Sequence, residues 1–339
     1  MKTRVAINGL GRIGRAFVRA AYNNPDIEIV AVNDLGSLDN LVYLLKYDSV
    51  YRQAPFTVAA KDGKLLLDGR EVAFLSEREP TGLPWGAMQV DVVVESTGVF
   101  DSYEKSQAHI TAGAKRVVIT APVKDAAVNG ATVLVGLNED KLQTCTISSN
   151  ASCTTNSASP LIAILDEGLG IEKALLNTVH SYTATQSLVD SPAKGDMRRG
   201  RAAAQNITPS STGAAVAVTK AYTNLDGKFD GIAIRVPTIS GSLVDITFVA
   251  KRDTTAEEVN ELLRAAAKSP RWQGIFDATE EELVSSDIVG SVYASIADLA
   301  MTRVTGGNLV KVLAWYDNEM GYAHTLVRHV QASGKNVAA

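Results

Sequence analysis

A glycine-rich turn near the N-terminus constrains the fold of this chain more than any other feature. The run Gly9-Leu10-Gly11-Arg12-Ile13-Gly14 has the spacing G-x-G-x-x-G and stands between a predicted strand over 5–8 and a predicted helix over 12–24. In that setting the first two glycines let the backbone approach a pyrophosphate, and the helix N-terminus offers free N–H groups. Read alone, the same glycines would be an ordinary tight turn, so it is the setting that predicts a dinucleotide site.

An acidic residue at the end of the next strand narrows the choice of cofactor. Asp34 follows the predicted strand 27–33, 20 residues after Gly14. A carboxylate at this place accepts hydrogen bonds from the ribose hydroxyls of NAD and repels the 2′-phosphate of NADP. The turn Ser96-Thr97-Gly98 follows an apolar strand over 90–95, where ligands of parallel sheets bind, although an ordinary loop is an equal alternative. The pattern favours NAD.

Strands and helices alternate along the first 150 residues. The expected strands are 5–8, 27–33, 90–95, 116–120 and 132–135, the expected helices are 12–24, 38–47 and 102–112, and two Asp-Gly hairpin turns fall within 56–75. This alternation predicts an α/β fold with a doubly wound parallel sheet, the Rossmann architecture.

The pattern changes near residue 150 to longer strands, which indicate an α+β catalytic domain with a mixed or antiparallel sheet. The strands are expected at 174–181, 229–236, 244–250, 292–298 and 309–316, and the helices at 154–167, 211–225 and 255–268. A last helix over 321–333 is expected to return to the first domain. We therefore expect an NAD-binding domain of 1–152 and 319–339 and a catalytic domain of 153–318.

Composition excludes several classes of protein. A length of 339 residues suits two domains, and a net charge of −4 argues against a general nucleic-acid binder. The two cysteines, Cys145 and Cys153, form neither a disulfide framework nor a CxxC pair, so we expect a reducing compartment and no metal site. The sequence has no long apolar run, which predicts neither a secretory signal nor a membrane span and favours the cytoplasm.

Cys153 is the candidate nucleophile. It lies in the polar run 149–156, where Ser152 is a suitable N-cap and a helix is expected from Thr154. Free N–H groups and the helix dipole at such a position lower a thiol pKa. The alternative is a buried structural cysteine, the interpretation we favour for Cys145 in its strand-like run.

The nucleophile needs a base, and the chain has four histidines. His180 ends a predicted strand just before the long polar loop 181–205, so it is expected to point from a rigid element into a cleft. His109 is expected on an exposed helix, and His324 and His329 on the terminal helix. His180 is therefore the candidate base.

Local positive charge within an acidic chain indicates an anion site. Lys194, Arg198, Arg199 and Arg201 cluster in the polar loop 181–205, and Pro209-Ser210-Ser211-Thr212-Gly213 is predicted to be a hydroxyl-rich helix start. Arg235 stands inside an apolar strand, where an unpaired charge would be unfavourable. A solvated loop is the alternative for the cluster, but together these features favour phosphate binding.

The chain resembles the phosphorylating glyceraldehyde-3-phosphate dehydrogenases over nearly its whole length. The matching motifs, in order, are INGLGRIGR (7–15), VND (32–34), KYDSV (46–50), ESTGVF (95–100), SNASCTTN (149–156), HSYTATQ (180–186), RRGRAAAQNI (198–207), PSSTGAA (209–215), RVP (235–237) and WYDNEMGY (315–322).

The resemblance implies a role for each matching residue. Cys153 is implied as the nucleophile and His180 as the base. The two sites for the substrate phosphate and inorganic phosphate are implied to use Ser152, Thr154, Thr183, Arg199, Thr212, Gly213 and Arg235. The implied NAD contacts are Gly9, Gly11, Arg12, Ile13, Gly14, Asp34, Arg78, Thr97 and Asn318, with Asn318 at the nicotinamide carboxamide.

The same resemblance implies substrates and an assembly. It implies oxidation of D-glyceraldehyde 3-phosphate by NAD with inorganic phosphate, in glycolysis or gluconeogenesis, by a homotetramer whose interface includes the loop 181–205. The variant reaction is that of erythrose 4-phosphate dehydrogenase, which hydrolyses the thioester. Other classes are weaker: an RNA-binding role conflicts with the acidic charge, and a cysteine hydrolase leaves the glycine motif and Asp34 without purpose. Ser191 departs from the family pattern and leaves some use of NADP open.

Overall fold

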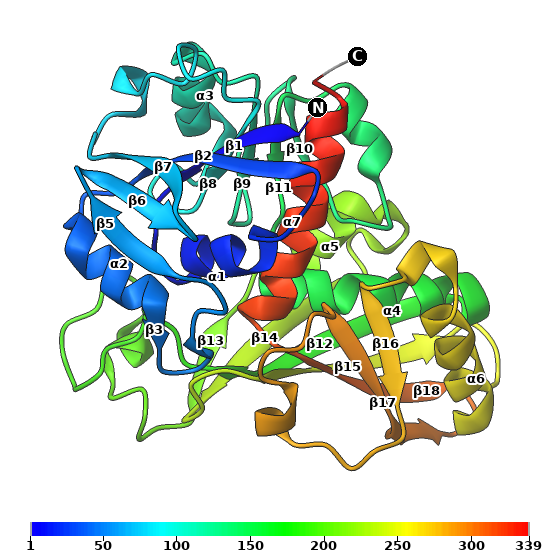
Figure 1. The fold of residues 1–339 in the computed structure, drawn as a ribbon. Helices are drawn as coiled ribbons and strands as arrows, with labels where there is room; N and C mark the ends of the chain where they lie inside the picture. The colour runs from blue at the N-terminus through cyan, green and yellow to red at the C-terminus, as the bar shows by residue number, and fades with distance from the viewer. Residues whose placement is uncertain (1, 338–339) are drawn as a thin grey trace. The chain divides into compact units, whose positions relative to one another are not determined.

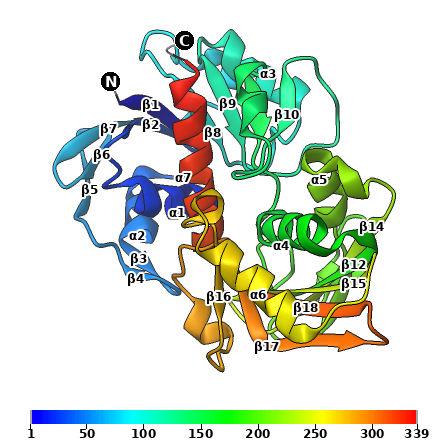
Figure 2. The ribbon, with the colours of Figure 1, turned by 90° about the vertical axis from the view of Figure 1, so that its right-hand side faces the viewer.

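The chain divides into two compact units. A computed structural model describes residues 2–337 (Figures 1 and 2). Unit 1 takes in the chain up to Ala151 and again from Ala323, and unit 2 runs from Ser152 to Tyr322. Within the described residues no helix is long and apolar enough to cross a membrane.

Unit 1 is built on a nine-stranded sheet in the order β10-β11-β9-β8-β1-β2-β7-β6-β5. From β10 to β7 neighbouring strands are parallel, and β7, β6 and β5 form antiparallel hairpins. The strands are β1 (Thr3–Asn8), β2 (Ile27–Asn33), β5 (Val58–Lys61), β6 (Lys64–Leu67), β7 (Arg70–Leu75), β8 (Val92–Glu95), β9 (Arg116–Ile119), β10 (Gly130–Thr132) and β11 (Ile147–Ser149), with β3 (Tyr47–Asp48) and β4 (Arg52–Gln53) as a separate pair.

Four helices belong to unit 1 in whole or in part, among the residues described: α1 (Arg12–Ala21), α2 (Leu38–Lys46), α3 (Tyr103–Thr111) and most of α7 (Met320–Lys335). α1 ends three residues before the predicted Asn24, because the N–H of Asn24 donates to the carbonyl of Ala21 and closes a turn ahead of Pro25. The Ser102 side chain caps α3 by accepting from the N–H of Lys105.

The two hairpins of unit 1 form at the predicted Asp-Gly turns. Asp62 and Gly63 have φ of 50° and 75°, and Asp68 and Gly69 have φ of 45° and 76°. Two successive left-handed residues are what a two-residue hairpin turn requires, and Asp and Gly adopt this conformation readily. The prediction of hairpins at these dipeptides is therefore confirmed.

Unit 2 carries a mixed seven-stranded sheet in the order β13-β14-β12-β15-β18-β17-β16. β12 runs parallel to β14 and β16 to β17, and the other pairs are antiparallel. The strands are β12 (Ile171–Ser181), β13 (Thr208–Ser211), β14 (Phe229–Val236), β15 (Ser242–Ala250), β16 (Phe276–Thr279), β17 (Ser295–Thr305) and β18 (Leu309–Tyr316), and the helices are α4 (Cys153–Leu169), α5 (Ala214–Ala221) and α6 (Ala256–Ala267). The predicted fold class, a doubly wound parallel sheet followed by a domain with a mixed sheet, is confirmed.

Several predicted elements are wrong in detail. The helix expected over 211–225 is β13 followed by the shorter α5, because Thr208–Ser211 pairs with β14 and Pro209 is tolerated on this edge strand. The strand expected over 132–135 ends at Thr132. The short β16 was not predicted, and the strand expected over 292–298 begins at Ser295 and continues to Thr305.

Candidate active site

A sharp turn presents Cys153 at the start of α4. Ala151 has a left-handed φ of 53°, and its N–H donates to the Ser149 hydroxyl. Ser152 is the N-cap, and its hydroxyl oxygen accepts from the N–H of Thr155 at 3.1 Å. Cys153 is therefore the first residue of a capped helix, as its setting predicts, and it is partly buried.

His180, near the end of β12, faces this thiol. Its Nε2 lies 3.4 Å from Cys153 Sγ, and the residue is 3% exposed. Arg235 is the neighbour of His180 in the parallel register of β12 and β14. Its Nη1 lies 2.6 Å from His180 Nδ1 and donates to the carbonyl of Ser181 at 3.2 Å. The structure thus brings a thiol, an imidazole and a guanidinium together.

Burial and positive charge keep the imidazole neutral. Loss of solvation, together with the charge of Arg235, lowers the pKa of His180 to about 3. Its Nδ1 lies between two groups with opposite roles: the Arg235 guanidinium, 2.6 Å away, can only donate, and the carbonyl of Ser181, 2.7 Å away, accepts a proton placed on Nδ1. With that proton placement Nε2 carries the lone pair toward Sγ, the form in which an imidazole takes up a proton.

The thiol pKa differs from the prediction. Burial raises the pKa of Cys153, although the charge of Arg235 and the N–H of Thr154 act in the opposite direction. The helix start was expected to lower this pKa. The expectation is wrong, because loss of solvent around Sγ outweighs the helix start and the guanidinium.

Tyr316, which no sequence motif singled out as a site residue, joins the elements that carry Cys153 and His180. Its hydroxyl lies 2.9 Å from Thr154 Oγ1 and 2.8 Å from Thr178 Oγ1, and its ring meets that of His180 edge-on with centroids 5.9 Å apart. Thr178 donates to the carbonyl of Leu243, so it accepts from Tyr316, which in turn accepts from Thr154. Thr154 thus lies against both Tyr316 and Cys153, whose pKa its side chain also lowers, and its expected role in anion binding stays a prediction.

Asn318 is held in one orientation. Its Oδ1 accepts from the Ser181 hydroxyl at 2.9 Å, the Gly241 N–H at 3.2 Å and the Ser242 hydroxyl at 3.1 Å. Three donors on the oxygen fix which way the amide faces. The amide nitrogen is consequently the group that Asn318 can offer to a ligand.

The residues expected to bind anions differ in their surroundings. Arg235 lowers the pKa of Cys153 by its charge, and the pKa of Arg235 is itself lowered by burial and, further, by the charge of Arg199. Thr212 accepts from the N–H of Ala214 at the start of α5, and Gly213 has open space above its Cα. Thr183 pairs with Thr185 at 2.9 Å.

The rest of the basic cluster is a solvated loop. Lys194 and Arg198 are exposed, and the exposed Arg201 pairs with Asp190 at 2.8 Å. Arg199 is less exposed and lies 3.6 Å from Asp196. Of the four basic side chains in the loop, Arg199 is therefore the one whose charge reaches Arg235. Within residues 2–337 no cluster of His, Cys, Asp or Glu could hold a metal ion.

Unit 1 contains a cavity of about 460 Å³ at the carboxyl ends of its parallel strands. Among the predicted cofactor residues it is lined by Gly9, Gly11, Asp34, Arg78 and Thr97, and the other lining residues are Asn8, Asn33, Leu35, Glu77, Glu79, Ser96, Val99 and Phe100. Arg12, Ile13 and Gly14 lie in α1, outside the lining, and Arg12 pairs with Asp48 at 2.5 Å.

The glycine turn fits a dinucleotide. Gly9 has a φ of 94°, and a Cβ there would lie 2.8 Å from the backbone nitrogen of Thr97. A Cβ on Gly14 would lie 2.1 Å from the carbonyl oxygen of Gly9, so only glycine lets α1 approach β1 this closely. Gly11 has open space above it, which leaves its backbone accessible to a pyrophosphate. Asp34 is fixed by the N–H groups of Leu10 and Gly36.

Known families match both halves of the chain. Residues 3–103 match the model for the NAD binding domain of glyceraldehyde 3-phosphate dehydrogenase, and residues 152–318 match the model for its C-terminal domain. The chain belongs to the glyceraldehyde-3-phosphate dehydrogenase family. It is accordingly an NAD-dependent dehydrogenase, with the cofactor domain of the family in unit 1.

Full-length members of the glyceraldehyde-3-phosphate dehydrogenase family are similar throughout. The relative from Thermotoga maritima is 50% identical over 327 residues, which cover 96% of this chain and 97% of the relative. The relative from Geobacillus stearothermophilus is 46% identical over 329 residues, with the same coverage. One from Mucor circinelloides f. lusitanicus is 43% identical over 341 residues and covers 100% of this chain.

Proposed function

We propose that the chain oxidises D-glyceraldehyde 3-phosphate to 1,3-bisphosphoglycerate, with reduction of NAD and uptake of inorganic phosphate, through a thioester on Cys153. The observation that carries the proposal is the 3.4 Å contact between Cys153 Sγ and His180 Nε2 beside the Arg235 guanidinium. Membership of the family supports the substrate, and the cavity around the glycine turn supports the cofactor.

Addition to the aldehyde begins with transfer of the thiol proton to His180 Nε2. The thiolate of Cys153 forms a bond to the aldehyde carbon, and the carbonyl electron pair moves to its oxygen. The imidazolium and the backbone N–H of Cys153 at the start of α4 stabilise this oxyanion. The imidazolium then gives its proton to the oxyanion, which leaves a neutral hemithioacetal and a neutral His180. The raised pKa of the thiol makes proton uptake by His180 a necessary part of this step.

Oxidation converts the hemithioacetal into a thioester. When bound, NAD supplies the acceptor for the hydride that leaves the substrate carbon. His180 takes the hydroxyl proton as the carbonyl reforms. The low pKa of His180, which reflects burial and Arg235, means that the ring returns readily to the neutral form once that proton is passed on.

Phosphate then cleaves the thioester. A phosphate oxygen bonds to the acyl carbon, and Cys153 leaves as the thiolate. We assign the anion contacts to Ser152, Thr154, Thr183, Arg199, Thr212, Gly213 and Arg235. Thr154 also lowers the pKa of Cys153 through its backbone N–H and its side chain. Two guanidiniums that influence each other electrostatically favour an anion between them, which supports the assignment.

Cofactor contacts are assigned to the glycine turn and the strand ends. Gly9, Gly11 and Gly14 shape the turn, and Arg12 and Ile13 contribute to the pyrophosphate site from the first turn of α1. Asp34 would accept from the ribose hydroxyls, and Arg78 and Thr97 would contact the adenine end. Asn318, with its oxygen occupied, would offer its amide N–H to the nicotinamide carboxamide.

Rates with NAD and NADP, each with and without phosphate, test the proposal. We expect sustained NADH formation only with NAD, aldehyde and phosphate, and at least about tenfold slower turnover with NADP. Cys153→Ala should abolish turnover, while Cys145→Ala, at a buried position in unit 1, should keep it. A steady rate independent of phosphate would indicate hydrolysis, as in erythrose 4-phosphate dehydrogenase, and would contradict phosphorolysis.

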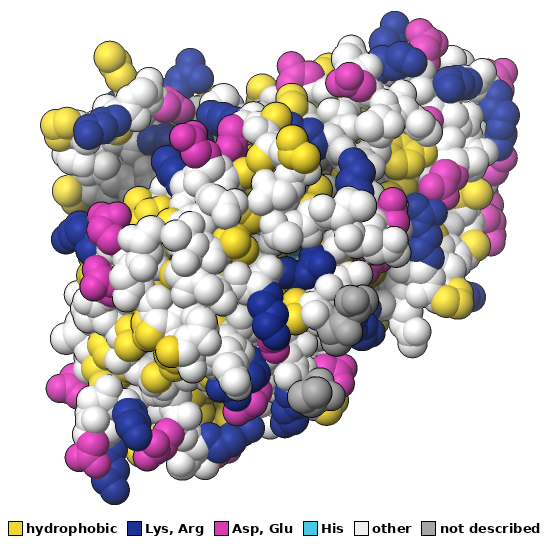
Figure 3. Space-filling view, turned by 90° about the horizontal axis from the view of Figure 1, so that it is seen from above, with side chains coloured by type: hydrophobic (Ala, Val, Ile, Leu, Met, Phe, Trp, Pro, Cys, Tyr) yellow, Lys and Arg dark blue, Asp and Glu magenta, His cyan; other side chains and the backbone are white. Residues whose placement is uncertain are grey.

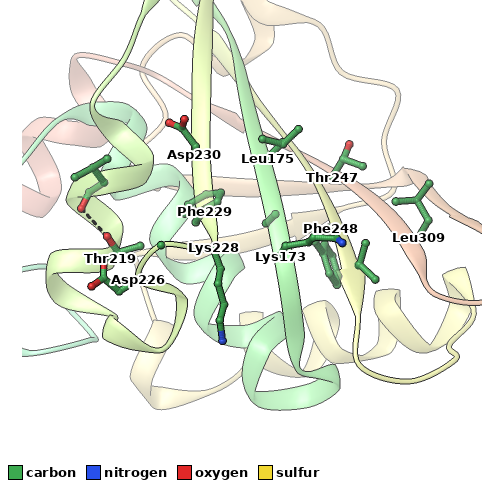
Figure 4. Close-up of a pocket in the computed structure, with 14 residues that line it drawn as sticks. Lys173, Leu175, Thr219, Asp226, Lys228, Phe229, Asp230, Thr247, Phe248 and Leu309 are labelled. Atoms are coloured by element: carbon green, nitrogen blue, oxygen red, sulfur yellow. Dashed lines mark hydrogen bonds between the residues drawn. The ribbon is translucent and has the colours of Figure 1, made fainter.

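We further propose a cytoplasmic homotetramer. Leu188, Val189 and Met197 are exposed in the loop 181–205, as interface residues would be in an isolated chain. Unit 2 also has a cavity of about 740 Å³ over β12, β14, β15 and β18, where Leu175 and Leu309 are exposed (Figure 4). Two free thiols are consistent with a reducing compartment.

Sedimentation analysis of the purified protein tests the assembly. A tetramer is the expected species, and a monomer at micromolar concentration would contradict it.

Nucleic acid is not proposed as a partner, because acidic and basic side chains are interspersed over the face drawn in Figure 3 and the net charge is −4.

A further inference from the structure

A buried carboxylate lies directly behind the wall of the cofactor cavity. Glu95, at the end of β8, is 2% exposed, and His109, on α3, is fully buried. His109 Nε2 lies 2.9 Å from Glu95 Oε2. The expectation that His109 is exposed is therefore wrong, because a partner distant in the sequence covers it: Trp85 lies with its Nε1 3.0 Å from His109 Nδ1.

Trp85 determines where the proton of His109 lies. An indole Nε1–H can only donate, so His109 Nδ1 must accept. The neutral ring then carries its proton on Nε2 and donates it to Glu95. The imidazole is thus fixed as a donor to the carboxylate by a side chain that does not touch the cavity.

The carboxylate receives three further donors. Its Oε2 also accepts from Asn8 Nδ2 at 2.6 Å. Its Oε1 accepts from the backbone N–H of Thr97 at 2.9 Å and from the Thr97 hydroxyl at 2.5 Å. Thr97 is exposed on the cavity wall, yet both of these polar groups point inward to Glu95. Glu95 therefore fixes the conformation of Thr97, a residue on the surface of the cavity.

The same network includes further residues that line the cavity. Asn8 Oδ1 accepts from Asn33 Nδ2 at 2.7 Å, and Asn33 Oδ1 accepts from the N–H of Glu77 at 2.8 Å. Asn8, Asn33, Glu77 and Thr97 all line the cavity. One hydrogen-bonded network thus connects the ends of β1, β2 and β8 with the segment that carries Arg78.

We propose that His109 and Glu95 are positioning residues for the dinucleotide, which preset the cavity wall before the cofactor binds. The inference rests on the proposed assignment of this cavity to the adenosine end of NAD. If the wall is already ordered, less of the binding free energy is lost in ordering side chains when the dinucleotide binds. Loss of the contact between His109 and Glu95 should therefore weaken dinucleotide binding without slowing the chemical steps.

Two amide substitutions at one position separate this role from plain structural support. In His109→Gln the amide N–H reaches the position of Nε2 and still donates to Glu95, whereas in His109→Asn the shorter side chain can serve Trp85 but not Glu95. Calorimetric titration with ADP-ribose and with NAD should give affinities within about threefold of the parent for His109→Gln and about tenfold weaker for His109→Asn. The kcat at saturating NAD should stay unchanged in both.

Equal affinity in the parent and in His109→Asn would overturn the inference, as would equal weakening in both variants. Should His109→Asn not fold, Thr97→Val at the exposed position should weaken ADP-ribose binding about fivefold, and unchanged binding would again contradict the role. Asp34→Ala is the control for the cavity itself. If it weakens ADP-ribose binding while His109→Asn does not, only this inference fails; if neither does, the proposed cofactor site is wrong.

Discussion

At the scale of single residues, the site of the nucleophile is governed by burial rather than by the helix start. Burial raises the pKa of Cys153, and burial together with the charge of Arg235 lowers that of His180 to about 3, so the pair is a neutral thiol beside a neutral imidazole. The charge of Arg235 opposes the rise in the pKa of Cys153 and adds to the lowering of the pKa of His180. The positive charge next to the pair therefore favours thiolate while disfavouring imidazolium.

This balance predicts the reactivity of the thiol. Alkylation of Cys153 by iodoacetamide should accelerate with pH above neutrality and show no inflection near 6.5, because His180 stays neutral through that range. Arg235→Leu should move the apparent pKa of Cys153 further upward, since a charge that lowers it is lost. The rate of alkylation measured between pH 6 and 10 checks both statements. A downward shift in Arg235→Leu would contradict the electrostatic role of Arg235.

The base has its own prediction. His180→Asn should reduce kcat roughly 10²- to 10⁴-fold, the usual contribution of a general acid–base residue. The substrate aldehyde, NAD and phosphate at saturation provide the assay. A loss of less than about threefold would place the base elsewhere.

At the scale of secondary-structure elements, Tyr316 joins three of them. Its hydroxyl connects Thr154 on α4 with Thr178 on β12, and its own strand is β18. The separation of 162 residues between Thr154 and Tyr316 explains why no local pattern revealed the contact. The only signal in the sequence was the hydroxyl of Tyr316, which stands at the end of a strand with alternating buried residues.

Tyr316→Phe should lower both stability and rate. Two hydrogen bonds are lost in the core, which should cost about 1–2 kcal/mol of unfolding free energy. The start of α4, with Cys153, would shift relative to β12, with His180, and kcat should therefore fall roughly tenfold. Tyr222→Phe is the matched control, because Tyr222 bonds to Asp166 elsewhere in unit 2 and should lose stability with kcat retained. Equal kcat in the two variants would remove the positioning role of Tyr316.

The terminal helix α7 carries a third buried histidine, which affects stability in acid. His329 lies between Ser148 Oγ at 2.8 Å and Asn150 Oδ1 at 3.0 Å, and burial lowers its pKa from 6.5 to about 3. Between these two values the unfolded chain binds the proton more readily than the folded chain, so this residue destabilises the fold as pH falls below 6.5.

His329→Asn should therefore reduce the loss of unfolding free energy that occurs when the pH falls below 6.5. At pH 5 the penalty from His329 is about 2 kcal/mol relative to neutral pH, and the variant should lose about that much less on acidification. Urea unfolding of parent and variant at pH 5 and 7.5 measures the difference. Parallel losses in the two proteins would show that His329 is not the group being titrated.

At the scale of the whole molecule, the fold class follows from local patterns, and the detailed site depends on long-range contacts. The glycine turn, the Asp-Gly hairpins and the alternation of elements are short-range signals, and each predicted feature formed. The exposure of His109 was wrong because Trp85, 24 residues away, covers it. The thiol pKa was wrong because burial of Cys153 is a tertiary property that the sequence around it does not reveal.

Cys153 is proposed to carry the substrate as a thioester until phosphate arrives. The most direct test of this role mixes the enzyme with aldehyde and NAD in the absence of phosphate, quenches in acid, and measures the mass of the protein and of its Cys153 peptide. We expect one NADH per chain, an acyl adduct confined to Cys153 that phosphate removes, and no adduct in Cys153→Ser. Formation of NADH with an unmodified Cys153, or an adduct on another residue, would contradict this role.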